Sequence, residues 1–377
     1  MAEEQARRKV ADAKRIVIKI GSSLLTDPAS GLAHAEIDRW CNQLVELSAA
    51  GRQPLIVSSG AVAEGVARLG WPGRPADLPR LQAAAAVGQM GLVQAYESAF
   101  ARRGRHTAMV LLTHEDLADR RRYLNARSTL THLLDLGVIP VINENDSVAT
   151  EEIRFGDNDT LAALVASLLA ADVVIVLTDV DGLYERDPRT NPGAGRLGYA
   201  EATDPGLDAL AGEGGSLGRG GMVTKIRAAR TAARSGAHTV IANGRKEGVL
   251  TRILAGETEG TLLAATVLPL VARKRWIAGQ LKPKGELVVD AGAAAAMRER
   301  GVSLLPVGVV AVHGKFVRGD LVRCVTESGE AVAQGLVNYS SGEAGRLAGA
   351  GTDEMAGILD YVEEPELMHR DNLVIVD

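Results

Sequence analysis

The chain has 377 residues, a length that indicates two or three domains. Of these residues 46% are hydrophobic and 24% charged, which is typical of a soluble globular protein. Its formal net charge of −5 disfavours a general nucleic-acid-binding protein, which needs a basic surface to displace phosphate counterions. The two cysteines, Cys41 and Cys324, lie far apart without metal-ligand spacing, which favours a reducing, cytoplasmic setting. The sequence has no secretory signal at its start and no apolar run of membrane-helix length, so we expect a soluble protein without a membrane partner.

The first predicted strand is Arg15–Ile20, a short apolar run that contains Lys19 and ends in a Gly-Ser-Ser turn. An ammonium group is costly to bury without a partner. We therefore expect Lys19 to project past the strand end toward an anion. The alternative is a strand residue that faces solvent.

A second strand is predicted over Pro54–Val57, after a helix over 33–50. It is followed by Ser58–Gly60, directly before a new helical pattern. Hydroxyl groups and a glycine at a helix start suit an anion-binding corner, although the same residue types also cap helices for local reasons. The signal is therefore weak by itself.

The next predicted elements are a long helix, a strand and a second helix. They cover Leu78–Ala101, with Gly88 and Gly91 as candidate breaks, His106–Leu112 and Arg120–Leu136. Together with the preceding elements, they set up an alternation of strands and helices that is typical of an α/β domain.

The most polar stretch of the chain follows the predicted strand Val138–Ile142 and precedes a predicted helix over Leu161–Ala170. Seven Asn, Asp and Glu side chains occur there in two bursts: Asn143, Glu144, Asn145, Asp146, Asp157, Asn158 and Asp159. Turn and capping chemistry explains one or two such residues, but not seven. Ligands bind outside the carboxyl ends of the strands in an open α/β sheet, so we predict a binding site here.

A central parallel strand is predicted over Asp172–Leu177, with 178–179 as polar residues at its carboxyl end. Gly220 and Gly221 then precede a helical pattern that has Lys225 in its first turn. Glycines let a phosphate approach the backbone closely. A lysine in the first turn opposes the helix dipole unless an anion lies nearby, so this position also points to an anionic ligand.

The alternation of elements predicts an α/β domain over 1–265, with a mostly parallel sheet sandwiched by helices. A basic linker follows over 266–284. Short strands separated by glycines then predict a small, mainly β domain over 285–365, and 366–377 form a C-terminal tail.

Several common enzyme motifs lack support. There is no P-loop, and the seven histidines show no metal-binding spacing, so no protein metal ligand is assigned. Gly193–Gly198 matches a dinucleotide-binding pattern and Gly214–Gly218 a nucleophile elbow, but neither follows a predicted strand. What remains is two lysines, two Gly/Ser helix starts and a set of carboxylates at strand ends. These suit phosphoryl transfer, with Mg²⁺ held mainly by phosphate oxygens.

The order and spacing of seven motifs resemble the glutamate 5-kinases of the amino acid kinase family. The motifs are Val17-Ile-Lys-Ile-Gly-Ser-Ser, Val57-Ser-Ser-Gly-Ala, Tyr123-Leu-Asn-Ala-Arg, Val141-Ile-Asn-Glu-Asn-Asp, Phe155-Gly-Asp-Asn-Asp, Leu177-Thr-Asp-Val-Asp-Gly-Leu-Tyr and Gly220-Gly-Met-Val-Thr-Lys. The C-terminal segments Gly301-Val-Ser-Leu-Leu-Pro-Val-Gly and Phe316-Val-Arg-Gly-Asp resemble the PUA domain that many of these kinases have. The resemblance covers nearly the whole chain.

The resemblance implies ATP-dependent phosphorylation of the γ-carboxylate of L-glutamate to L-glutamyl 5-phosphate, the first step of proline biosynthesis. ATP and Mg²⁺ are the implied cofactors, proline the expected feedback inhibitor, and a homodimer or homotetramer the expected assembly. The residues alone support only a small-molecule kinase. Other kinases of this family, which act on aspartate, acetylglutamate, carbamate or UMP, stay open at this point.

The resemblance also implies roles for individual residues. Lys19 and Lys225 would neutralise the phosphates, and Asp159 would orient the two lysines. Glutamate would be held by Ser59, Asp146 and Asn158, with Asp157 in support. ATP would be bound by Lys19, Thr178, Asp179, Arg219, Gly220, Gly221, Met222, Val223, Thr224 and Lys225. Arg219 departs from the family pattern, which often has a small Thr there.

Two other functions are disfavoured. RNA binding through the PUA domain conflicts with its charge, because 284–364 contain 7 Lys or Arg against 12 Asp or Glu. A structural or regulatory role of that domain is the expectation. A catalytically dead sensor conflicts with the presence of both lysines and the acidic cluster.

Overall fold

The computed structural model describes residues 1–27, 31–148, 158–186, 191, 193–210, 221–266, 283–362 and 364–376. The chain divides into two compact units, Met1–Leu117 with Ala126–Pro269, and Ala118–Asn125 with Leu270–Asp377. Most of the predicted linker 266–284 lies outside the described residues. Within the described part of the chain, no helix is both long and apolar enough to cross a membrane.

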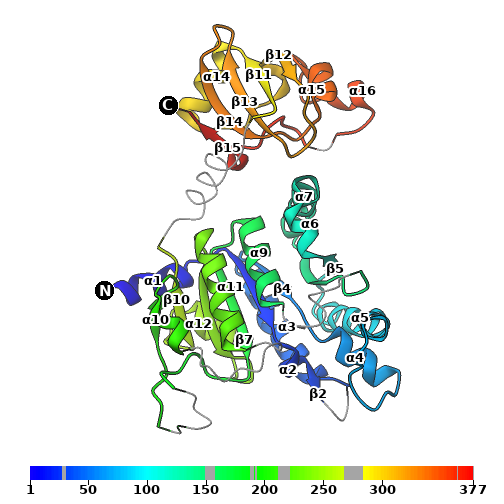
Figure 1. Ribbon diagram of the computed structural model, residues 1–377, viewed down its shortest axis with the longest axis vertical. Helices are drawn as coiled ribbons and strands as arrows, with labels where there is room; N and C mark the ends of the chain where they lie inside the picture. Colours follow the sequence, from blue (N-terminus) through cyan, green and yellow to red (C-terminus); the bar gives the residue numbers. More distant parts are fainter. Residues whose placement is uncertain are drawn as a thin grey trace. The chain divides into compact units, whose positions relative to one another are not determined.

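The first unit is built on an eight-stranded sheet, some strands of which are labelled in Figure 1. The strand order is β5-β6-β4-β1-β7-β9-β10-β8. In that order the strands are Thr107–Leu112, Ile139–Glu144, Gln53–Val57, Arg15–Ile20, Val173–Thr178, His238–Asn243, Thr261–Ala264 and Tyr199–Glu201. Neighbouring strands are parallel throughout, except that β9 and β10 are antiparallel. The predicted mostly parallel sheet is confirmed, and its central strands are apolar because both of their faces are covered.

Helices alternate with these strands along the chain, and several of them pack on the sheet. The helices are α1 (Ala2–Ala11), α2 (Ser22–Leu25), α3 (His34–Ala49), α4 (Ala61–Arg68), α5 (Leu78–Ala101), α6 (His114–Ala118), α7 (Arg120–Asp135), α9 (Asp159–Leu169), α10 (Gly206–Leu210), α11 (Met222–Arg234) and α12 (Val249–Leu254). A two-stranded ribbon, β2 (Thr26–Asp27) with β3 (Gly31–Leu32), follows α2.

Strand β1 shows how the two faces differ. Side chains alternate along a strand, and Ile16, Ile18 and Ile20 pack in one core cluster with Trp40 of α3 and Tyr96 of α5. The helices α9 and α11 pack on each other and against β1, β7 and β9. The intervening side chain of Lys19 therefore lies on the α9 and α11 side of the sheet.

Helix α5 is continuous, so the expectation that Gly88 or Gly91 breaks it is wrong. The glycines serve close packing between α4 and α5. A Cβ at Gly88 would lie 1.9 Å from the carbonyl oxygen of Ala61, and one at Gly65 would lie 1.7 Å from that of Ala84. The two helix backbones thus meet where neither has a side chain.

We expect Gly88→Ala to lower the free energy of unfolding by about 1–3 kcal/mol, because the added methyl group overfills this contact. The urea midpoint of the full chain measures the effect. Gly73→Ala is the matched control, because no atom of another residue lies within 4 Å of the Cβ position there. Equal midpoints for the two variants would contradict the close approach of α4 and α5.

The second unit contains a five-stranded sheet with the order β12-β11-β13-β14-β15. Its elements are β11 (Gly285–Val289), α14 (Ala291–Arg300), η1 (Pro306–Gly308), β12 (Val309–Gly314), β13 (Leu321–Thr326), β14 (Ala331–Leu336), α15 (Ser341–Leu347), α16 (Met355–Leu359), η2 (Arg370–Asn372) and β15 (Leu373–Ile375). The expected C-terminal tail contributes β15, which pairs antiparallel with β14. A separate core that includes Leu287, Val322 and Tyr339 holds this unit together.

Candidate active site

Three charged side chains meet on the α9 and α11 side of the sheet, and we call them the Asp159 cluster. Lys19 Nζ, near the end of β1, lies 2.5 Å from Asp159 Oδ1, and Lys225 Nζ, in the first turn of α11, lies 3.0 Å from Asp159 Oδ2. The three residues are at most 5% exposed. Two ammonium groups from distant parts of the chain therefore share one buried carboxylate.

Electrostatics keep this carboxylate ionised. Burial opposes the charge on Asp159, but the positive charges of Lys19 and Lys225 outweigh burial and hold the pKa of Asp159 well below its usual value. Asp159 is also the first residue of α9, where the helix dipole favours an anion. It compensates in turn for the unfavourable position of Lys225 at the start of α11.

Thr224 adds a hydroxyl group to the same cluster. Its Oγ1 lies 3.0 Å from Asp159 Oδ2 and 2.8 Å from the carbonyl oxygen of Gly221, which is the N-cap residue of α11. The hydroxyl has one proton and donates it to one of these oxygens at a time. It ties the first turn of α11 to the N-terminus of α9.

A small cavity of about 220 Å³ lies at the carboxyl ends of β4 and β6. Its polar lining residues are Ser22, Ser23, Thr26, Ser59, Arg74, Asn143, Glu144, Asp146 and Asn158. The structure therefore brings Ser59, Asp146 and Asn158, three residues expected to bind substrate, to one pocket. The cavity suits a molecule of amino-acid size and is smaller than the typical pocket of a larger ligand.

Asn158 is held in a fixed orientation at the base of this cavity. Its Nδ2 donates to the carbonyl oxygen of Ser58 at 2.5 Å and to Asn143 Oδ1 at 2.8 Å. Asn143 Nδ2 donates in turn to Gln89 Oε1 of α5 at 2.8 Å. Because Asn158 directly precedes Asp159, the cavity and the Asp159 cluster are joined at the start of α9.

The hydroxyl group of Ser59 is the clearest sign of a ligand. Ser59 is 5% exposed, and its Oγ has no hydrogen-bond partner among the described residues. Buried polar groups are almost always hydrogen-bonded, so an orphan hydroxyl that lines a cavity indicates a missing partner. Gly60 follows with φ of +90°, which suits glycine and lets the chain turn sharply from β4 into α4.

Two carboxyl groups give the cavity a negative side. Glu144 is buried at the end of β6, and Asp146 follows it, half-buried. Burial raises the pKa of Asp146 to about 7, with a further increase from the charge of Glu144 that Arg74 partly offsets. A positively charged amino group would be a favourable partner for this side of the cavity.

Of the other residues expected to bind ATP or to support glutamate binding, some have described positions and some do not. Thr178 ends β7 beside β1, and its Oγ1 donates to Asp179 Oδ1 at 3.1 Å. Gly221, Met222 and Val223 form the N-cap and first turn of α11 with Thr224 and Lys225. Asp157, Arg219 and Gly220 lie outside the described residues. Among the residues with described positions, no group of three or more His, Cys, Asp or Glu is placed to hold a metal ion.

The sequence included Asn143 and Glu144 in the predicted binding site but gave them no individual role, and it gave no role to Arg74. Asn143 and Glu144 stand out in the sequence as polar residues at the end of an apolar strand. Arg74 lies in a Gly- and Pro-containing connection between α4 and α5, and no spacing or periodicity marked it. Its place at the cavity depends on how the chain folds.

Comparison with known proteins follows the same division of the chain. The chain belongs to the amino acid kinase family, whose family model matches residues 14–243. The family model of the PUA domain matches residues 285–359. It is 59% identical over 371 residues to glutamate 5-kinase of Stutzerimonas stutzeri strain A1501, covering 98% of this chain and 100% of that protein. It is 60% identical over 373 residues to glutamate 5-kinase of Thioalkalivibrio sulfidiphilus strain HL-EbGR7, covering 99% and 100%. The solved UMP kinase of Bacillus anthracis is similar with a TM-score of 0.49 at 17% identity, covering 68% of this chain and 97% of that one.

Proposed function

We propose that this chain transfers the γ-phosphoryl group of ATP to the γ-carboxylate of L-glutamate and forms L-glutamyl 5-phosphate, the first step of proline biosynthesis. The observation that supports it most is the Asp159 cluster beside a small cavity with an orphan serine hydroxyl. Relatives that are 59% and 60% identical over nearly the whole chain are glutamate 5-kinases, which supports glutamate as the substrate.

The proposed chemistry needs positioning and charge neutralisation rather than a general base. The γ-carboxylate of glutamate has a pKa of about 4.3, so it is already an anionic nucleophile at neutral pH. Asp159 is held by two lysines and is not available to remove a proton. Lys19 and Lys225 would stabilise the charge on the transferring phosphoryl group, and Asp159 would hold the two ammonium groups in place.

Substrate and nucleotide would bind on the two sides of this cluster. We propose that Ser59, Asn158 and Asp146 hold glutamate, with Asp157 in support. ATP would contact Thr178, Asp179 and the segment 219–225. Mg²⁺ is the expected companion of ATP, and the described residues offer few ligands for it, so phosphate oxygens would supply most of its coordination.

The test is ADP release from MgATP with L-glutamate, L-aspartate, N-acetylglutamate and UMP, each alone, with hydroxylamine present to trap an acyl phosphate. Glutamate-dependent ADP release with formation of the γ-hydroxamate is the expected result. Turnover with another of these substrates in place of glutamate would show that the chain is a kinase with a different substrate. Absence of turnover with all four would contradict the proposal.

The raised pKa of Asp146 predicts how kcat/KM for glutamate depends on pH. With a pKa of about 7 in the free protein, Asp146 is mostly protonated at pH 6 and mostly ionised at pH 8. If its carboxylate binds the α-ammonium group, kcat/KM for glutamate should fall by about tenfold between pH 8 and pH 6. The measurement is a series of glutamate saturation curves at constant ionic strength.

The matched variant for this prediction is Asp146→Asn, which removes the titrating group and keeps the shape of the side chain. Its kcat/KM for glutamate should be low and should lose this pH dependence. A wild-type kcat/KM that stays constant from pH 6 to pH 8 would show that Asp146 does not bind the ammonium group.

Four further properties belong to the same proposal. We propose feedback inhibition by proline, a homodimer or homotetramer, a catalytic domain over 1–265 with a structural or regulatory domain over 285–365, and a cytoplasmic location. The buried free cysteines Cys41 and Cys324 suit a reducing compartment. Proline titration at subsaturating glutamate and light scattering of the purified chain test the first two.

A further inference from the structure

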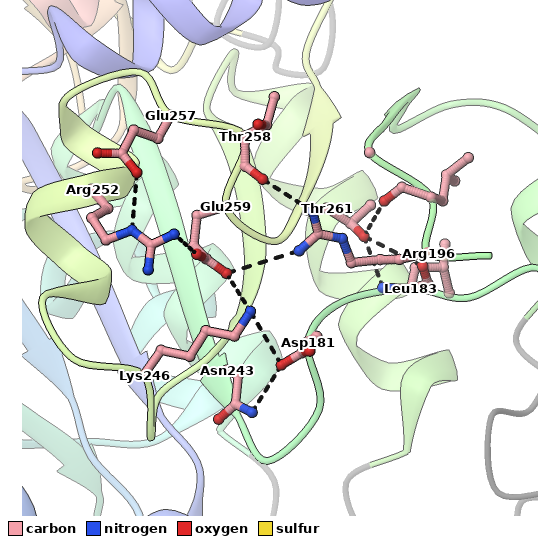
Figure 2. Close-up of polar contacts among 12 residues, drawn as sticks. Asp181, Leu183, Arg196, Asn243, Lys246, Arg252, Glu257, Thr258, Glu259 and Thr261 are labelled. Atoms are coloured by element: carbon pink, nitrogen blue, oxygen red, sulfur yellow. Dashed lines mark hydrogen bonds and ion pairs between the residues drawn. The ribbon is translucent and has the colours of Figure 1, made fainter. Parts of the chain in front are cut away.

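The turn after strand β7, residues Thr178–Leu183, is held by a polar cluster that the proposed chemistry does not use (Figure 2). We call Asp181, Arg196, Asn243, Lys246, Arg252 and Glu259 the Glu259 cluster. These residues come from the β7 turn, from the approach to β8, from the end of β9, from the segment before α12, from α12 itself and from the segment before β10. Segments far apart in sequence thus converge on one short turn.

The middle of the turn is held through Asp181. Its Oδ1 accepts a hydrogen bond from Asn243 Nδ2 at 2.9 Å, and Lys246 Nζ lies 3.4 Å from the same oxygen. The hydrogen bond from Asn243 and the nearby charge of Lys246 lower the pKa of Asp181, so it is a carboxylate at neutral pH. Figure 2 shows Asp181 pointing toward Asn243 and Lys246.

Lys246 is itself held in place by Glu259. The Lys246 Nζ–Glu259 Oε1 distance is 2.9 Å, and the side chain of Glu259 is 3% exposed. Arg252 Nη2 lies 2.6 Å from Glu259 Oε2, and Arg196 Nη1 lies 3.8 Å from Oε1. The buried carboxylate is therefore neutralised by three cations and anchors Lys246 beside Asp181.

Both ends of the turn are held by the neighbouring strands. The backbone N–H of Gly244 donates to the carbonyl oxygen of Thr178 at 2.9 Å. The N–H of Leu183 donates to Thr261 Oγ1 at 2.8 Å. Gly182 has φ of +145°, and a Cβ there would lie 2.5 Å from Thr261 Oγ1, so the chain passes β10 too closely for a side chain.

We infer that Asp181, Asn243, Lys246 and Glu259 are positioning residues for the nucleotide: they fix the β7 turn so that Thr178 and Asp179 present a preformed surface to MgATP. The inference rests on the proposed function, in which Thr178 and Asp179 contact ATP. Asp181 is engaged by Asn243 and Lys246 and acts through the turn rather than on the ligand. A turn fixed before binding costs less ordering entropy when the nucleotide arrives.

The decisive variant is Lys246→Gln in the full-length protein. We expect the dissociation constant for MgATP, measured by titration calorimetry without glutamate, to rise about tenfold, in the range seen when a supporting contact behind a ligand-binding group is lost. The KM for MgATP should rise in parallel, while the KM for glutamate and kcat stay within about twofold. Lys246→Arg keeps a cation beside Glu259 and should retain most of the affinity.

Two comparisons separate positioning from general stability. Arg103→Gln breaks the 2.6 Å ion pair with Asp38, a carboxylate about as exposed as Asp181. This variant should leave MgATP binding unchanged. Asp181→Asn should weaken MgATP binding in the same direction as Lys246→Gln. The dissociation constant for MgATP of the double variant should lie less than about twofold above that of the weaker-binding single variant, because both changes loosen the same turn.

The possible results distinguish this inference from the proposed function. The inference is overturned if both Lys246→Gln and Asp181→Asn leave the MgATP affinity unchanged, or if KM rises equally for MgATP and glutamate. Neither result contradicts the proposed kinase activity. If the wild-type chain binds MgATP but turns over no substrate, the proposed function fails. The binding comparison then still decides the role of the Glu259 cluster.

Discussion

Replacing Lys225 by glutamine is expected to lower kcat by about 10²–10³-fold, the usual cost of removing one group that stabilises charge in a transition state. Lys225 Nζ lies 3.0 Å from Asp159 Oδ2 at the start of α11, beside Thr224 and Gly221. An amide keeps part of the side-chain volume but has no positive charge for the phosphoryl group. The KM for glutamate should change little, because the cavity at β4 and β6 stays intact. Hydroxamate formation at saturating MgATP measures the effect.

The matched control is Arg227→Gln, on the same helix two residues further along. Arg227 is exposed, and its substitution removes one positive charge without touching the Asp159 cluster. It should keep kcat within about twofold, since exposed charges away from a site have small effects. A kcat for Lys225→Gln equal to that of Arg227→Gln would remove Lys225 from the proposed mechanism.

The second large effect is expected for Asp159→Asn, which should lower the free energy of unfolding by about 3–5 kcal/mol at neutral pH. The substitution leaves the buried ammonium groups of Lys19 and Lys225 without the carboxylate between them. The folded-state pKa of Asp159 lies below the ordinary value of 3.8, so its contribution is fully present above that pH. It is lost as the pH falls through the folded-state pKa. Urea unfolding of the ligand-free protein at pH 7 measures the difference.

A second substitution makes this prediction specific. Asp159→Asn combined with Lys19→Met removes one of the two buried ammonium groups that face the changed side chain, so the double variant should recover part of the lost stability. Asp208→Asn breaks an exposed ion pair with Arg230 and should leave the urea midpoint close to that of the wild type. If Asp159→Asn were as stable as Asp208→Asn, the buried Asp159 cluster would be wrong.

Strand ends were the part of the fold that the sequence predicted best. β1 and β7 are short apolar runs bounded by polar or glycine residues, and each was predicted to within one residue. The same contrast marked Asn143 to Asp146, at and just beyond the end of β6, as part of a predicted binding site, and the structure places Asp146 and Asn158 at one cavity. Polar residues at strand ends could be grouped from the sequence because the contrast with the apolar strand is local.

Elements that depend on tertiary pairing were missed. β8 and β10 have three and four residues, too few for a period to emerge, and they exist because they pair with each other at the sheet edge. β15 has three residues and forms only against β14. Helix α14 was overlooked despite a capping Asp290 and Gly301 at its end, because the surrounding short strands dominated the pattern.

The contacts within the site were beyond the reach of the sequence. Nothing in the pattern of α5 indicates that Gln89 meets Asn143, since the two residues lie 54 positions apart in the chain. The Glu259 cluster likewise joins side chains from segments beside β7, β8, β9 and β10, whose order in the sheet differs from their order in the chain. Such contacts follow from topology rather than from local spacing.

The origin of the three residues of the Asp159 cluster bears on how the protein acquires activity. Lys19 comes from the first strand of the unit, Asp159 from its middle and Lys225 from a late helix, so the cluster is complete only after α11 has docked. During refolding from urea, enzymatic activity should therefore return no earlier than the slowest-folding of the three segments that contain Lys19, Asp159 and Lys225. Activity then reports completion of the whole sheet, whereas helical signals would recover earlier from local structure. A partial detachment of α11 would silence the protein while leaving most of its structure in place.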